Sequence, residues 1–264
     1  MPLLPFSSQQ TEISQARLAV LIDADNAQPA IIDGLLDEVA KYGIASIRRI
    51  YGDWTSGRLN TWKSLLLEHA IQPIQQFSYT TGKNATDSAL IIDAMDLLYG
   101  EKLDGFCIVS SDSDFTRLAA RIRQSGLIVY GFGEKKTPKA FVSACSHFIY
   151  TENLRGNAND SSLDGTEEDE TKPVVKSKKD FKVDKKVLKL LHDAVDDLAD
   201  DTGWAYLGGV GQKINNRSAD FDPRNYGFKK LGDLFKAIPQ FEIEDRPQAN
   251  GMGRHIYIRW KKKR

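Results

Sequence analysis

Aspartate residues occur at three places in the first half of the sequence, each next to an apolar run. Asp23 ends the apolar run of LIDADN, Asp87 precedes the apolar stretch of NATDSAL, and Asp112 and Asp114 follow FCIVSS. Carboxylates that converge repel one another unless a cation neutralises them. Their oxygens are the hard ligands that Mg²⁺ or Mn²⁺ prefers. Such an ion activates water and stabilises negative charge on a phosphodiester, so this residue set indicates metal-dependent hydrolysis.

A more ordinary role competes with this interpretation, because an aspartate after a strand usually caps the next helix. Asp112 or Asp114 alone fits a cap, and Asp23 alone fits a turn. Capping does not explain why acids follow both strands that we expect to be neighbours. We therefore favour a metal site of four aspartates, with Asn26 orienting a ligand or the scissile phosphate.

The segments around these residues alternate between apolar runs and amphipathic helical stretches. We expect strands at 18–23, 45–51, 72–77, 106–111, 127–132 and 147–150, with helices at 29–42, 60–69, 86–99, 114–124 and 138–145. This alternation predicts an α/β fold whose parallel sheet is covered by helices on both faces. A strand order of about 3-2-1-4-5 makes the first and fourth strands neighbours, and ligands bind at their carboxyl ends. Asp23 and Asp112 should then face each other.

Three segments, LIDADN, TDSALIIDAMDLL and IVSSDSDF, together resemble the NYN domains of the PIN-like nuclease superfamily, closest to the LabA-like branch. The resemblance spans roughly residues 17–150 and implies a PIN-like sheet and an Mg²⁺- or Mn²⁺-dependent ribonuclease that acts on single strands. It places the family's metal-binding acids on Asp23, Asp87, Asp112 and Asp114, and its first-strand asparagine on Asn26.

Asp93 also matches an acid of this family, but its position on the predicted helix argues against a metal ligand. It lies six residues after Asp87, which is about 240° around an α-helix. Both side chains cannot point at one ion, so we expect a structural role for Asp93.

The charge of the chain is divided unevenly, although the formal net charge is zero. Residues 1–150 hold 14 basic and 16 acidic residues, 151–180 hold 5 and 8, and 181–264 hold 17 and 12. An acidic part can concentrate cations, and a basic part can hold a polyanion. The polar segment 152–180 has almost no large apolar residue, so we expect a flexible linker between a domain at 1–151 and a domain at 181–264.

The basic C-terminal part shows three helical stretches, near 185–198, 207–215 and 227–237, followed by strands at 241–245 and 255–260. This pattern predicts a small winged helix-turn-helix domain. The segment resembles the OST-HTH (LOTUS) domain, which implies RNA binding, although that family also includes modules that bind proteins. Its basic side chains are expected to face solvent and hold phosphates: Lys213, Arg217, Arg224, Lys229 and Lys230.

Two cysteines without metal-site spacing, no apparent signal peptide and no membrane-spanning run predict a soluble cytoplasmic protein. The leading functional hypothesis is a metal-dependent ribonuclease whose second domain captures single-stranded RNA. A non-catalytic RNA- or protein-binding regulator with a vestigial acidic site is the main alternative. A phosphatase acting on small molecules is a third possibility, but it gives the basic domain no obvious use. The oligomeric state stays open.

Overall fold

The first domain contains one six-stranded sheet in which all neighbouring strands are parallel. The computed structural model describes residues 15–55, 57–77, 85–154, 184–247 and 254–261. The strand order β3-β2-β1-β4-β5-β6 confirms the predicted doubly wound arrangement and adds β6 at one edge. The strands are β1 (Arg17–Asp23), β2 (Ile44–Gly52), β3 (Gln72–Gln75), β4 (Gly105–Val109), β5 (Ile128–Gly133) and β6 (His147–Tyr150).

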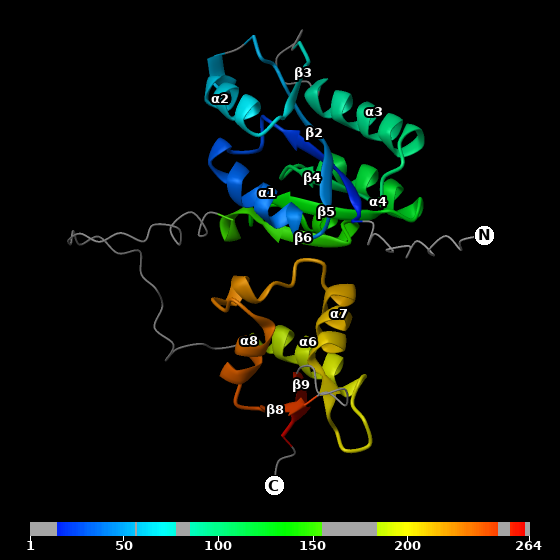
Figure 1. Cartoon of the computed structure of the whole chain (residues 1–264), viewed down its shortest axis with the longest axis vertical. Coiled ribbons are helices and arrows are strands. Elements are labelled where there is room, and N and C mark those ends of the chain that lie inside the picture. Colours follow the sequence, from blue (N-terminus) through cyan, green and yellow to red (C-terminus); the bar gives the residue numbers. More distant parts are fainter. Residues whose placement is uncertain (1–14, 56, 78–84, 155–183, 248–253, 262–264) are drawn as a thin grey trace, which may run out of the picture.

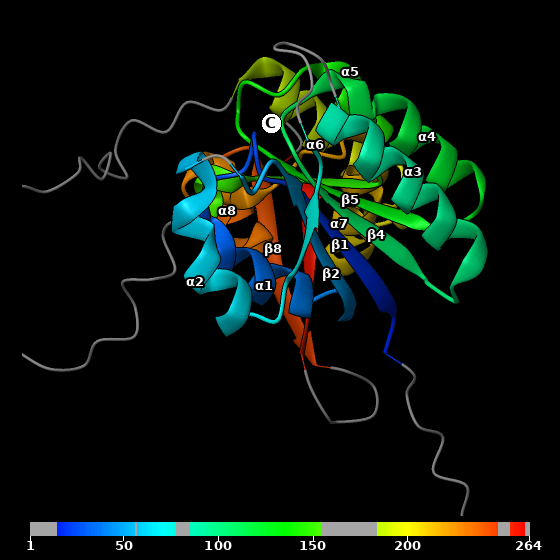
Figure 2. The ribbon, with the colours of Figure 1, turned by 90° about the horizontal axis from the view of Figure 1, so that it is seen from above.

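Helices cover both faces of this sheet, as Figure 2 shows. On one face lie α1 (Ile32–Ala40) and α2 (Asn60–Glu68); on the other lie α3 (Ala85–Gly100), α4 (Thr116–Gln124) and α5 (Lys139–Ala144). Successive side chains of a strand point to opposite faces. In β1, Leu18, Val20 and Ile22 therefore join the first core, whereas Ala19 and Leu21 join the second. Burial on both faces explains why residues 18–22 of β1 and all of β4 are apolar.

The second domain is a winged helix. It contains α6 (Lys185–Asp196), α7 (Leu207–Arg217), α8 (Leu231–Ala237) and a sheet of order β7-β9-β8, with β7 (Ala205–Tyr206), β8 (Phe241–Pro247) and β9 (Arg254–Trp260). The helix expected from residue 227 begins four residues later. A 3-10 turn over Pro223–Tyr226 ends at Gly227, whose φ of 83° interrupts the helix.

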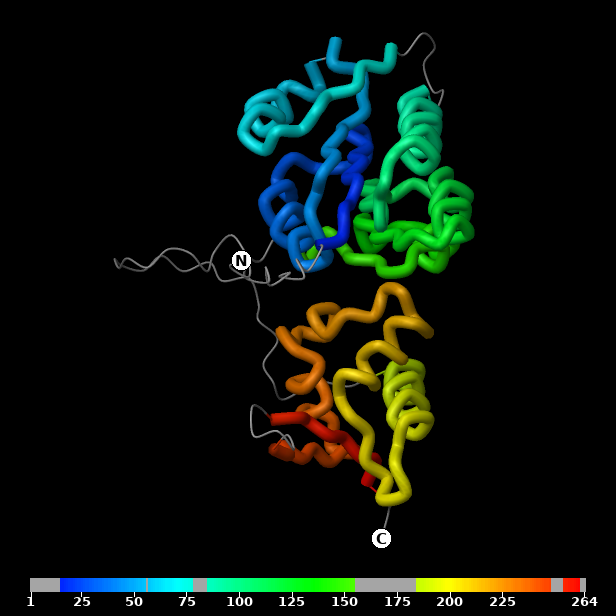
Figure 3. Tube along the Cα trace, turned by 45° about the vertical axis from the view of Figure 1, so that its right-hand side comes forward, coloured from blue at the N-terminus to red at the C-terminus, as the bar shows by residue number. Residues whose placement is uncertain are grey.

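The two domains are in direct contact along the edge strand β6, which faces the second domain in Figures 1 and 3. The amide of Phe148 donates to the carbonyl of Ala219 at 2.7 Å. The hydroxyl of Tyr150 donates to Asp220 at 3.0 Å. The second domain thus covers an edge whose free amide groups would otherwise be open to pairing with another chain.

An ion pair between the domains reinforces this contact. The guanidinium of Arg224 donates to both carboxylate oxygens of Glu38, at 2.8 and 3.0 Å, and the Glu38 side chain is 3% exposed. Burial by itself raises the pKa of Glu38, but hydrogen bonds from Arg224 and Lys41 outweigh burial and lower it. Bidentate pairing fixes the direction of approach as well as holding the charge.

Residues 152–154, which the sequence assigns to the linker, lie within the first domain. Residues 151–153 form a 3-10 turn, and Leu154 is 2% exposed within the first core. The remainder of the expected linker, from residue 155, lies outside the described residues. Among the described helices, none is both long and apolar enough to cross a membrane.

Candidate functional site

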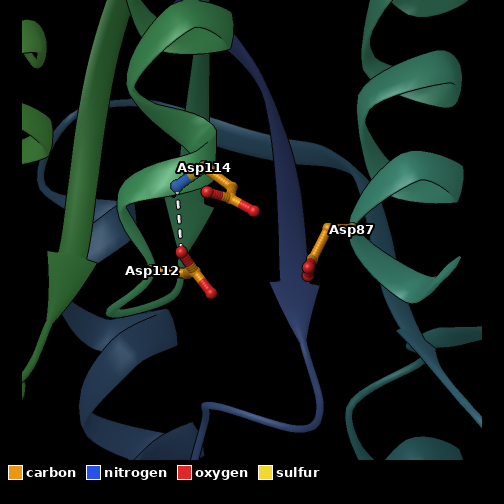
Figure 4. A group of neighbouring side chains, drawn as sticks. All are labelled: Asp87, Asp112 and Asp114. Carbon is orange, nitrogen blue, oxygen red and sulfur yellow. Dashed lines mark hydrogen bonds between the residues drawn. The ribbon is translucent and has the colours of Figure 1, made fainter. Parts of the chain in front are cut away.

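Three carboxylates meet at the carboxyl ends of the central strands. Asp87 lies in the first turn of α3, whereas Asp112 and Asp114 follow β4. One oxygen of each lies within 4.8 Å of one oxygen of the others. Figure 4 shows Asp87 on one side of the end of β1 and the other two carboxylates on the opposite side. The doubly wound topology creates this convergence, because it brings β4 beside β1 and directs the start of α3 toward their ends.

Asp112 both caps a turn and belongs to this group of carboxylates. The side chain of Asp112 accepts a hydrogen bond from the amide of Asp114 at 2.9 Å and caps the 3-10 turn Ser113–Phe115. One oxygen of Asp112 accepts this hydrogen bond, and the same carboxylate is one of the three that converge. The cap therefore orients a carboxylate that also belongs to the site.

Asp23 lies beside this group and is fully buried. One of its oxygens accepts from Asn26 at 2.7 Å and from Ser110 at 2.8 Å, and the other accepts from the amide of Asp25 at 3.1 Å. The Ser110 hydroxyl in turn accepts from the amide of Asp112 at 3.1 Å. Asp23 and Asp112 are thus joined through one serine, as the expected neighbouring strands require, but Asp23 is outside the group of three.

The electrostatics of the site favour a bound proton or cation. The pKa of Asp87 rises from 3.8 to about 6, first because it is partly buried and then because Asp23, Asp112 and Asp114 repel its negative charge. Burial also raises the pKa of Asp23, and its hydrogen bonds oppose that rise. Without a cation, the site holds mutually repelling acids at neutral pH.

These features fit a hard divalent cation. The donors are carboxylate oxygens, Asp87 and Asp112 are half-buried, and Asp114 is exposed, so the group is open toward solvent on one side. Mg²⁺ and Mn²⁺ take oxygen ligands and retain positions for water or phosphate. The three carboxylates Asp87, Asp112 and Asp114 are the residues that would hold such an ion.

Asp93 points away from the site, as its spacing from Asp87 predicts. It accepts hydrogen bonds from Arg49 and Tyr51 on β2. This pair of contacts fastens α3 to the sheet, so Asp93 positions the helix that carries Asp87.

The basic residues predicted in the second domain do not form one free face. Lys213 and Arg217 both pair with Asp197, at 2.9 and 2.7 Å. Lys229 and Lys230 are exposed between the 3-10 turn and α8. The placement of Arg224 corrects the expectation for that residue: its guanidinium is bound to Glu38 and Asp222 in the domain contact, which removes it from a phosphate-binding face.

Glu38 is the residue of the domain contact that sequence reasoning missed. Its signal was present in the pattern of α1: it lies three residues after Leu35, next to Val39, on the stripe of the helix that should be apolar. A carboxylate on a buried stripe requires a cationic partner. Nothing in the pattern of residues indicates that the partner lies 186 positions away.

Three solved structures resemble parts of the chain. A protein of unknown function from Vibrio parahaemolyticus is 17% identical with a TM-score of 0.43, covering 52% of this chain and 94% of its own. An uncharacterized protein from Nitrosomonas europaea is 31% identical with a TM-score of 0.30, covering 38% and 94%. A protein from Chromobacterium violaceum is 28% identical with a TM-score of 0.25, covering 30% and 83%. No curated protein matches the chain.

Two protein families match the chain, and together they span both domains. The OST-HTH/LOTUS domain matches residues 179–252, which supports RNA binding by the winged helix. The NYN domain matches residues 17–154, the whole of the six-stranded sheet and its helices. NYN domains belong to a nuclease-type superfamily of PIN-like fold, in agreement with the strand order and the acidic group. The chain therefore belongs to the NYN domain family and carries a C-terminal OST-HTH/LOTUS domain.

Proposed function

We propose that this protein is an Mg²⁺- or Mn²⁺-dependent ribonuclease that hydrolyses phosphodiester bonds of single-stranded RNA. The observation that carries the proposal is the approach of Asp87, Asp112 and Asp114 within 4.8 Å at the carboxyl ends of the central strands. The OST-HTH/LOTUS domain supports RNA as the substrate class.

The residues divide the work between holding the cation and ordering its surroundings. Asp87, Asp112 and Asp114 would hold the ion, which would act as a Lewis acid toward a phosphate oxygen and lower the pKa of a bound water. Asp23 fixes Asn26 and Ser110 through hydrogen bonds and adds negative charge beneath the group. The amide of Asn26 has a second hydrogen atom with which it can orient a phosphate oxygen.

The test is cleavage of single-stranded RNA with Mn²⁺, with and without a chelator, by the full chain and by Asp112→Asn. We expect the chelator and the substitution each to abolish cleavage. Asp96→Asn is the matched control, because Asp96 is an exposed aspartate on α3 outside the group. Equal cleavage in all samples would contradict the proposal.

Metal binding is measured separately from activity. Titration calorimetry with Mn²⁺ should give a binding isotherm for the wild type and for Asp96→Asn, and a strongly weakened one for Asp87→Asn. Absence of Mn²⁺ binding to the wild type would instead favour a non-catalytic RNA-binding regulator.

A further inference from the structure

A groove runs along the contact between the two domains and consists of two adjoining hollows. The first has a volume of about 440 Å³ and is lined by Lys135, Lys139, Tyr150, Lys186 and Tyr226, among others. The second, of about 680 Å³, is lined by Lys139, Arg123, Asn215 and Arg217, among others. Both include Lys139, Ser218 and Asp220, so we treat them as one interdomain groove.

The charge of this groove is positive. Five basic side chains, Arg123, Lys135, Lys139, Lys186 and Arg217, line it together with two acidic ones, Asp184 and Asp220. Arg217 is paired with Asp197, so the lysines carry most of the available positive charge. Asp220 already accepts hydrogen bonds from Tyr150 and Ser218. The three lysines are exposed and come from both domains, so only the docked arrangement places their charges along one path.

The walls of the groove also include aromatic rings. Tyr150 and Tyr226 line the first hollow and are half-buried. A positively charged groove that follows the backbone, with aromatic side chains beside it, is the arrangement that binds single-stranded nucleic acid. Duplex RNA is recognised instead by its shape and its 2′-hydroxyl groups across the wide minor groove, not by stacking of unpaired bases on aromatic rings.

One loop connects the groove to the carboxylate group. The amide of Glu134 donates to the Ser111 hydroxyl at 2.9 Å, and Ser111 immediately precedes Asp112. The next residue, Lys135, lines the groove, and its amide donates to Glu152 at 3.0 Å. The basic end of the groove therefore begins beside the acidic site, along the segment EKKTPK at 134–139.

We propose that the interdomain groove binds the backbone of single-stranded RNA and leads it toward the carboxylate group. This inference rests on the proposed function for its substrate class. It also gives the second domain a role beyond capturing RNA near the site. Docked on β6, this domain forms one wall of the groove that the RNA follows.

The experiment measures RNA binding by the full chain without reference to cleavage. A labelled single-stranded RNA of about ten nucleotides, within the usual site size of such proteins, is titrated by fluorescence anisotropy in chelator. Its integrity is checked on a gel. For Lys135→Ala/Lys139→Ala, loss of two phosphate contacts should reduce the slope of log K against log salt by about 1.4. Affinity should fall on the order of tenfold at about 0.1 M salt.

Two further variants make the outcome decisive. Lys63→Ala/Lys102→Ala removes the same charge from exposed sites outside the groove and should leave the slope unchanged. Lys229→Ala/Lys230→Ala tests the face that the sequence predicted. An unchanged salt slope for Lys135→Ala/Lys139→Ala would overturn the proposal that the groove binds RNA. A loss of affinity confined to Lys229→Ala/Lys230→Ala would overturn it as well. A protein that binds RNA through the groove but never cleaves it would refute the proposed hydrolysis but not the proposed RNA binding by the groove.

Discussion

Replacement of Arg224 by alanine should release the winged helix from the NYN domain. Arg224 is the cation that the second domain supplies to Glu38, whose side chain is 3% exposed. In Arg224→Ala the two guanidinium bonds to Glu38 are lost, while Lys41 and Tyr42 still contact the carboxylate, at 2.7 and 3.1 Å. Hydrogen bonds around Phe148, Tyr150 and Asn153 also join the domains and remain in this variant.

The size of the effect follows from this environment. Removing one partner of a buried ion pair costs about 3–5 kcal/mol, mainly because the other charge is left buried. Lys41 and Tyr42 keep Glu38 partly satisfied, and the Arg224 side chain is 25% exposed, so we expect the lower end, about 3 kcal/mol. At about 1.4 kcal/mol for each factor of ten, the ratio of docked to separated domains falls by about two orders of magnitude.

Backbone NMR relaxation measures this change directly. In the wild type, amides of both domains should report one rotational correlation time, because the domains tumble together. In Arg224→Ala each domain should tumble faster, and the amide of Phe148 should lose protection from hydrogen exchange because its acceptor, Ala219, belongs to the other domain.

Arg254→Ala is the matched control, since Arg254 on β9 pairs with Asp245 on β8 and takes no part in the contact between the domains. It should tumble as the wild type does. A double-mutant cycle with Glu38→Gln should show coupling between positions 38 and 224. An Arg224→Ala protein with wild-type correlation times and no coupling to Glu38 would refute the reasoning.

Three further outcomes follow from the first domain. Folding raises the pKa of Asp87 to about 6, so the folded state binds this proton more tightly than the unfolded state. In metal-free protein the free energy of unfolding should therefore fall as pH rises from about 4 to 6. Urea melts at each pH should show that Asp87→Asn weakens this pH dependence of the free energy of unfolding. A steeper pH dependence in Asp87→Asn would contradict the prediction. Asp93→Ala should lower the free energy of unfolding by about 1.5–3 kcal/mol, because it breaks hydrogen bonds to a charged group. It should also leave Mn²⁺ affinity within a few-fold, and loss of Mn²⁺ binding with unchanged stability would instead make Asp93 a ligand. Gly131→Ala places a methyl group 2.5 Å from the Phe148 ring and should cost about 1–3 kcal/mol by overpacking, visible as a lower urea midpoint. An unchanged midpoint would show that the ring can move aside.

Local pattern determined the α/β fold and the positions of its main elements. The apolar runs of β1 and β4 required burial on both faces, and the alternation of strands with helices then required a parallel sheet. The strand order followed from the usual topology of such sheets, and that order by itself placed Asp23 and Asp112 at neighbouring strand ends. The separation of Asp93 from the site followed from helical geometry alone.

Tertiary structure decided which partners the charged side chains have. The sequence placed Asp23 beside Asp112, but only the tertiary structure shows that hydrogen bonds to Asn26, Ser110 and Asp25 bury it next to the group of three. The sequence also placed Arg224 on a solvent-facing surface, whereas Glu38 holds it between the domains. Sequence periodicity reports which face of an element is buried, because burial repeats along the chain. It does not report which distant residue satisfies a buried charge, because that partner is chosen by the packing of elements far apart in the chain.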